Sequence, residues 1–183
     1  MRHVVTTGRG GVAGDLGEQE RFCAAAWPRL VAAVSHHCGD VHVAEELVQE
    51  ALVRACRRWS HVSRLSSPEG WTYRVAVNLA NSAWRRQRAE RRAYARHGPP
   101  EAVVRSVAVE EQQAVHAALQ SLTAPQREAV ILRYLLDLSV EQTAELLGKR
   151  PGAVRALTHR AITRLRPVLD VTEEVTEEAD DVS

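Results

Sequence analysis

The chain has 183 residues, of which 45% are hydrophobic, so it is long enough to fold unaided as one large domain or two small ones. Its formal net charge of +1 hides an uneven distribution, because residues 170–181 hold seven carboxylates and no cation, which leaves the rest of the chain basic. The composition argues against a membrane protein, an exported protein and a disulfide scaffold: no apolar run approaches a membrane span, the glycine-rich start has no hydrophobic signal core, and the three cysteines are odd in number. We therefore expect a cytoplasmic protein.

Helical periodicity runs through the chain without a convincing alternating strand, and it predicts an all-α fold. A disordered leader is expected at 1–17, followed by a first helix over about 18–37 that Pro28 can bend or restart. A second helix follows Asp40, a capping residue. Its apolar stripe comprises Ala44, Leu47, Val48, Ala51, Leu52, Ala55 and Trp59.

A histidine-rich cluster precedes the second helix, where His36, His37 and Cys38 are followed by His42. The cysteines lack the paired short spacing of structural zinc sites, and a helix start capped by Asp40 explains the polarity of this segment. We therefore expect no metal here. Stoichiometric zinc in purified protein would overturn that interpretation.

A third long helix is expected from Ser67-Pro68-Glu69 to about Arg92, after a polar loop at 60–67. Its end, from Trp84 to Arg92, sets five arginines against one carboxylate. Aromatic faces beside arginines suit unstacked bases as well as phosphates. Trp71 is better explained as a core anchor, whereas the sequence leaves the roles of Tyr73 and Trp84 open. Together the three helices predict a first compact domain at 18–95.

Residues 96–109 include Gly98-Pro99-Pro100 and should form a flexible linker, because consecutive prolines cannot continue a helix. We expect the domains on either side to be tethered rather than fused. A helix resumes around Val115 to Leu119, and the capping box of Thr123 and Gln126 starts the next. The second domain should span 110–168.

Residues 138–166 have the pattern of a helix-turn-helix. Ser139 and Gln142 form a capping box, Gly148 is a natural left-handed stop, and Pro151 suits the first turn of the second helix. From Gly148 to Arg166 there are six Lys or Arg residues and no carboxylate, whereas an ordinary exposed helix mixes both signs. Val154, Leu157, Ala161 and Leu165 form one stripe, opposite Gly152, Arg155, Ala156, His159 and Thr163. This pattern predicts contact with the major groove of DNA.

Three segments in order carry a resemblance to a known family: Ala44 to Ala51, Gly70 to Asn81, and Leu138 to Arg166. Over about residues 20–168 the sequence resembles the extracytoplasmic-function sigma factors of the sigma-70 family, which are two-domain initiation subunits of bacterial RNA polymerase. The resemblance implies a sigma-2-like helical bundle and a sigma-4-like helix-turn-helix domain. It also implies that Leu47 and Val48 face the core.

The resemblance implies a role for each surface. Polymerase-binding residues would be Asp40, Glu45, Glu46, Gln49 and Glu50. The loop from Trp59 to Glu69 would receive a flipped base, and residues for minus-10 recognition and melting would be His61, Arg64, Trp71, Asn78, Asn81, Trp84, Arg85, Arg86 and Arg88. Residues for minus-35 recognition would be Lys149, Arg150, Gly152, Arg155, Ala156, His159 and Arg160.

The implied partners are core RNA polymerase, through the coiled coil of its largest subunit and its flap, promoter DNA, and a possible anti-sigma factor that wedges between the domains. We expect a monomer without cofactor, catalytic residues or enzymatic activity. The acidic tail at 169–183 should be disordered, either as a solubilising end or as a competitor of DNA for the basic helix. The alternative function is an independent dimeric helix-turn-helix regulator that binds duplex operator DNA.

Overall fold

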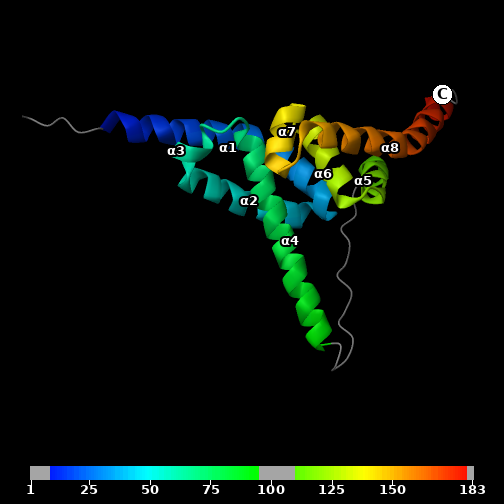
Figure 1. The fold of residues 1–183 in the computed structure, drawn as a ribbon, viewed down its shortest axis with the longest axis horizontal. Helices are drawn as coiled ribbons and strands as arrows, with labels where there is room; N and C mark the ends of the chain where they lie inside the picture. Colours follow the sequence, from blue (N-terminus) through cyan, green and yellow to red (C-terminus); the bar gives the residue numbers. More distant parts are fainter. Residues whose placement is uncertain (1–8, 95–109, 181–183) are drawn as a thin grey trace, which may run out of the picture.

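The structure is a computed structural model that describes residues 9–94 and 110–180, with side chains at 16–89 and 114–167. It is all-α, and these ranges hold helices and turns without a strand (Figure 1). The elements in chain order are α1 (Arg9–Cys38), α2 (Val41–Arg57), α3 (Trp59–Val62), α4 (Pro68–Tyr94), α5 (Glu110–Ser121), α6 (Ala124–Val130), the π-helix η1 (Ile131–Leu135), α7 (Val140–Leu147) and α8 (Pro151–Asp180). Within the described ranges, none of the helices has the length and hydrophobicity that a membrane crossing requires.

The predicted helix boundaries are confirmed where a local cap sets them. Asp40 Oδ1 accepts hydrogen bonds from the backbone N–H groups of His42 and Val43 at 2.8 and 3.1 Å, which starts α2. The capping boxes of Thr123 and Ser139 are both present, and Gly148 ends α7 in the left-handed conformation with φ 60°. These ends depend on contacts within a few residues, so the sequence is sufficient to locate them.

Three predictions about local structure were wrong. Residues 9–17 lie in α1 and residues 169–180 lie in α8, although we expected disorder in the leader at 1–17 and the tail at 169–183; the rest of both segments lies outside the described residues. Backbone hydrogen bonds in a helix are local, so a helix that starts in the packed region can propagate without tertiary contacts. The predicted polar loop at 60–67 includes part of helix α3, because buried Trp59 and Val62 anchor this turn to the core. The predicted linker at 96–109 lies outside the described residues.

The first four helices form a bundle in which α1, α2 and α4 pack against one another (Figure 1). The predicted stripe of α2 is confirmed, since Val48 and Leu52 are buried and Leu47 is partly buried against the core. Fully buried residues from α1 and α4 complete this core, among them Leu30, Val34, Tyr73 and Val77. The second half of α4 projects away from the other helices.

The two halves of the chain also pack against each other and share one buried cluster, a contact that the sequence analysis did not anticipate. Ile131, Leu132, Leu136 and Leu138 belong to the same buried cluster as Leu30 of α1. The physical reason is that η1 and the turn after it carry apolar surface that the second domain alone does not cover. A separate cluster holds the second domain together and comprises Ala118, Leu119, Leu122, Val130, Ala161 and Leu165.

Candidate nucleic-acid interface

The second helix of the helix-turn-helix presents an open cationic face. Val154, Ala161 and Leu165 are buried, as the predicted stripe requires. The opposite face, with the turn before it, is exposed at Lys149, Arg150, Gly152, Arg155, His159 and Arg160, and Ala156 is half-buried. A shallow hollow extends this face toward α6, lined by Gln126, His159, Arg160, Thr163 and Arg164. The helix therefore has the charge and the access that contact with a major groove needs.

Among the described residues, one carboxylate contacts this face, and the sequence analysis did not predict it. Glu141 Oε1 on α7 lies 3.2 Å from an Arg155 guanidinium nitrogen, and both side chains are more than 60% exposed. An exposed pair of this kind contributes about 0–1 kcal/mol, so it can orient Arg155 without preventing its release to DNA. No sequence pattern predicts this pair, because Glu141 lies on α7 and Arg155 lies on α8.

The arginine-rich part of α4 forms a second basic surface. Asn78 is exposed and Asn81 is half-buried, and their spacing places them on the same side of the helix as Arg85. Arg85 Nε donates to the Asn81 carbonyl oxygen at 3.3 Å, and another of its guanidinium nitrogens contacts Ser82 Oγ at 3.2 Å. Arg86 and Arg88 are exposed. The described part of this surface thus offers amides and cations to a phosphate backbone or an unpaired base.

The three aromatic residues beside this surface differ in burial. Tyr73 is fully buried in the shared core, and Trp71 is half-buried against the cluster of Ala55, Trp59 and Val62. Burial raises the pKa of the Tyr73 phenol well above its usual range. Trp84 is 41% exposed and stacks on His37, with ring centroids 5.8 Å apart. Of the three, Trp84 is the one with a substantially exposed face for a base.

The loop before α4 is only partly accessible. His61 and Arg64 are exposed, and Arg64 Nε donates to the Ser60 carbonyl oxygen at 2.5 Å. At the other end of the loop, Ser66 Oγ donates to Glu145 Oε2 at 2.9 Å, and Gln142 Nε2 donates to the Ser66 carbonyl oxygen at 2.7 Å. Helix α7 therefore lies against the predicted base-receiving loop, which the sequence did not indicate.

A third surface is the polar face of α2, opposite its buried stripe. Glu45, Glu46, Gln49 and Glu50 are all exposed. Within the helix, His42 Nδ1 lies 3.7 Å from a Glu45 carboxylate oxygen, and Arg54 Nε lies 2.9 Å from a Glu50 carboxylate oxygen. Asp40 differs from these residues because its carboxylate caps α2. Its position therefore has a structural explanation that does not involve a partner protein.

In the histidine-rich cluster, His36, His37 and Cys38 lie between packed helices, whereas His42 is exposed. Burial, with a smaller effect of Arg127, lowers the pKa of His37 to about 4. Burial lowers the pKa of His36 and raises that of Cys38, whose thiol donates to the Asp40 carbonyl oxygen at 3.3 Å. Among the described residues, no group of three or more His, Cys, Asp or Glu residues is arranged to hold a metal ion.

Comparison with known proteins decides the family. The model of sigma-70 region 2 matches residues 25–90, and the model of sigma-70, region 4 matches residues 112–165. The chain belongs to the extracytoplasmic-function sigma factors of the sigma-70 family. It is therefore a transcription-initiation sigma factor. Region 2 corresponds to α1–α4 and region 4 to α5–α8.

Several curated relatives match most of the chain. An RNA polymerase sigma-E factor from Streptomyces coelicolor is 30% identical over 162 residues, which are 85% of this chain and 88% of the relative. The RNA polymerase sigma-E factor of Streptomyces antibioticus is 31% identical over 134 residues, covering 69% of this chain and 71% of the relative. The ECF RNA polymerase sigma factor EcfG of Rhodopseudomonas palustris is 30% identical, with 80% and 82% covered.

Two solved structures share the fold. The sigma factor RpoE in complex with the anti-sigma factor NepR from Bartonella quintana has a TM-score of 0.69 at 24% identity, covering 84% of this chain and 98% of that one. CnrH, solved in complex with the cytosolic domain of CnrY, has a TM-score of 0.60 at 21% identity, with 87% and 92% covered. At these identities the likeness shows the fold alone.

Proposed function

We propose that three separate surfaces divide the work of initiation in this chain. The exposed face of α2 binds core RNA polymerase, α4 with the loop before it engages the minus-10 element, and the N-terminal part of α8 reads the minus-35 element. The observation that carries this proposal is the opposite charge of the surfaces: α2 presents carboxylates, whereas α4 and α8 present arginines. Carboxylates suit a basic protein partner, and arginines suit phosphates and guanine edges.

For the minus-35 element, Arg155 and His159 would reach base edges, while Lys149, Arg150 and Arg160 would contact phosphates. Small Gly152 and Ala156 leave room for the groove wall. An arginine can bridge O6 and N7 of a guanine, so we assign the strongest base discrimination to Arg155.

For the minus-10 element, one strand must leave the duplex. Asn78, Asn81, Arg85, Arg86 and Arg88 would contact its backbone and unpaired bases, with Trp84 as the stacking surface and His61 and Arg64 in the loop. Trp71 would support the loop through the core instead of touching DNA.

Protein partners of two kinds follow from the proposal. One is core RNA polymerase, which supplies the chemistry. The other is an anti-sigma factor, which the pairing of RpoE with NepR in a similar fold makes a reasonable partner class. The alternative function, a dimeric operator-binding regulator, is not favoured.

The decisive experiment adds the purified chain to core polymerase that lacks any sigma factor and sequences the transcripts made from fragmented genomic DNA. Initiation at a set of sites sharing two upstream elements would support the proposal. Absence of transcripts from a folded chain that binds duplex DNA alone would favour the independent regulator.

The α2 assignment has its own test in Glu45→Lys. The reversed charge should face cations of the polymerase and weaken binding by about tenfold or more, measured by competition for core enzyme. Glu20→Lys on α1 is the matched control, because Glu20 is exposed outside the α2 face. Equal affinities for both variants would refute the assignment.

A further inference from the structure

Two cysteines lie in contact where the end of α2 packs against α1. The turn at residues 39–40 joins these helices, and Cys23 and Cys56 face each other far from that turn, with their Sγ atoms 3.6 Å apart. One of the two thiols donates a weak hydrogen bond to the other sulfur. The cysteines are 33 positions apart in the chain, so a bond between them would close the two helices into a ring.

The neighbours of this pair are fixed by packing. The ring of Phe22, directly before Cys23, lies against the ring of Trp59, with centroids 5.1 Å apart. Trp59 and Ala55, on either side of Cys56, are buried in one cluster with Val62. The backbone around both cysteines is thus held by contacts that bring the two sulfurs together.

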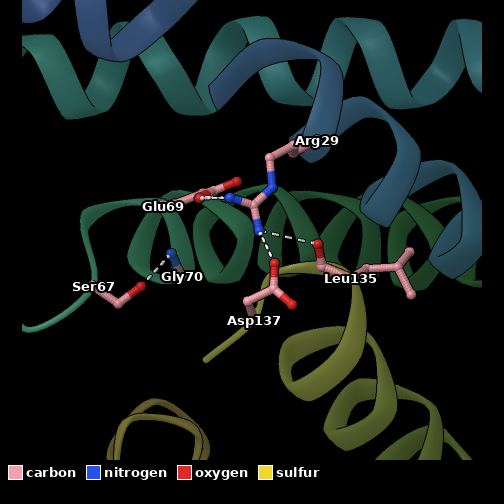
Figure 2. Close-up of polar contacts among 6 residues, drawn as sticks. All are labelled: Arg29, Ser67, Glu69, Gly70, Leu135 and Asp137. Atoms are coloured by element: carbon pink, nitrogen blue, oxygen red, sulfur yellow. Dashed lines mark hydrogen bonds and ion pairs between the residues drawn. The ribbon is translucent and has the colours of Figure 1, made fainter. Parts of the chain in front are cut away.

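Polar contacts fix α1 farther along its length. Arg29 lies 3.3 Å from a Glu69 carboxylate oxygen in the first turn of α4, and it donates to Asp137 Oδ2 at 2.9 Å (Figure 2). The same guanidinium donates to the Leu135 carbonyl oxygen at 3.2 Å. Because Arg29 and Cys23 lie on one continuous helix, these bonds oppose sliding of Cys23 along α2.

The contact between the sulfurs is close to what a disulfide bond requires. The bond needs a distance of about 2.0 Å. Modest rotations about the two Cα–Cβ bonds close the present separation of 3.6 Å. Cys23 and Cys56 are both partly exposed, so a small oxidant can reach them. Cys38 differs, because its thiol donates to the Asp40 carbonyl oxygen at 3.3 Å.

We propose that Cys23 and Cys56 form a site of reversible oxidation, at which a peroxide converts the two thiols into a disulfide that closes the ring between α1 and α2. The site is independent of the three surfaces assigned above. The fold of region 2 stays the same, because the sulfurs already touch before the bond forms. The bond restricts the unfolded chain and therefore stabilises region 2 while an oxidant is present.

One peroxide molecule balances the reaction. The Cys56 sulfur attacks a peroxide oxygen and breaks the O–O bond, which leaves a sulfenic acid on Cys56 and releases one water with the thiol proton. The Cys23 sulfur then attacks the Cys56 sulfur, and the S–O bond breaks as hydroxide leaves with the Cys23 proton as a second water. The two thiols lose two electrons, and the peroxide takes them up.

The order of these attacks follows from the surroundings of Cys23. Burial, together with the hydrogen bond to Cys56, raises the pKa of Cys23 to about 11. The thiolate is the nucleophile in such reactions, and Cys23 remains a thiol at neutral pH. The first attack on the peroxide therefore falls to Cys56.

The test treats the reduced full chain with one equivalent of hydrogen peroxide and maps the products by mass spectrometry. Trypsin cuts after lysine and arginine, so each cysteine falls on its own peptide: Cys23 on 22–29, Cys38 on 30–54 and Cys56 on 55–57. Cys23→Ala and Cys56→Ala each remove one member of the pair. Cys38→Ala is the matched control, because it removes the third thiol and keeps the pair.

The wild type and Cys38→Ala should each lose two free thiols and yield peptide 22–29 joined to peptide 55–57. Their midpoint of thermal unfolding should rise by about 5–10 °C, and a thiol reductant should reverse the rise. Cys23→Ala and Cys56→Ala should show neither change. A wild type that forms no bond, a bond to Cys38, or a bond between two chains on a non-reducing gel would overturn the site. A bond that forms without raising the midpoint would overturn its stabilising role.

Discussion

The two surfaces proposed to meet promoter DNA differ in access. The cationic face of α8 is open to solvent, and the carboxylate pairing with Arg155 is itself exposed. The loop before α4 is instead bonded at one end, where Ser66 contacts Gln142 and Glu145 of α7, while His61 and Arg64 stay exposed. Charge patterns identify both surfaces in the sequence, but tertiary packing decides which one is available. The cationic face of α8 is therefore unobstructed in this structure, whereas α7 occupies one end of the loop before α4.

The largest expected effect tests whether region 4 shares a core with region 2. Leu132→Ala removes a fully buried side chain of region 4 and should lower the free energy of unfolding by about 2–5 kcal/mol. All four tryptophans lie in region 2, so their fluorescence reports that region alone. If the regions share a core, the variant should shift the unfolding transition seen by tryptophan fluorescence as much as the transition seen by circular dichroism. An unchanged tryptophan transition would mean that the regions unfold independently.

The next effect concerns pH where the two regions pack together. His37 is buried among Tyr73 and Trp84 of α4 and lies near Arg74 and Arg127, and its pKa is lowered from 6.5 to about 4. Between these values the unfolded chain binds a proton that the folded chain does not. Protonation of His37 therefore does not reduce the free energy of unfolding above pH 6.5. Between pH 6.5 and 4 it lowers that free energy by about 3 kcal/mol.

Urea unfolding at pH 7.5 and 4.5 measures this loss. His37→Gln serves as the control. The carboxyl groups of Asp and Glu titrate in both proteins, whereas the contribution of the histidine is absent from the variant. The difference between the two pH profiles isolates His37. Parallel profiles would show that its burial does not govern the acid sensitivity of the protein.

On the open surface, Arg155→Ala should reduce discrimination at one minus-35 base pair by about 1–3 kcal/mol in the holoenzyme. Arg160→Ala should instead weaken binding to every promoter sequence by the same factor, because a phosphate contact does not depend on base identity. Affinities for a set of singly substituted promoters distinguish the two patterns. If Arg155→Ala lowers every affinity equally, Arg155 contacts a phosphate.

The smallest effect is expected at Tyr73. Its hydroxyl is buried and has no hydrogen-bond partner among the described residues. Tyr73→Phe should change the free energy of unfolding by less than about 1 kcal/mol, since the variant keeps the ring and removes only the unpaired polar group. Thermal unfolding measures the change. A large loss of stability would reveal a polar role that packing does not explain.

Sequence reasoning succeeded where the determining contacts are local. The cap of α2 at Asp40, the left-handed stop at Gly148 and the buried stripe around Val48 depend on neighbours within one or two helical turns. The contact of Arg29 with Asp137 joins residues 108 positions apart, and no periodicity encodes such a pair. The burial of Tyr73 was equally hidden, because part of its surroundings comes from region 4.

The turn at Lys149 has a practical consequence for chemical labelling. Lys149 is the single lysine among 24 basic residues, and it is exposed immediately before the recognition helix α8. Every other basic side chain of that count is a guanidinium, which amine-selective acylating reagents leave intact at neutral pH. Apart from the terminal amine, such a reagent therefore marks one atom of the chain, Lys149 Nζ. Its rate of modification would report occupancy of the helix-turn-helix by promoter DNA without any engineered probe.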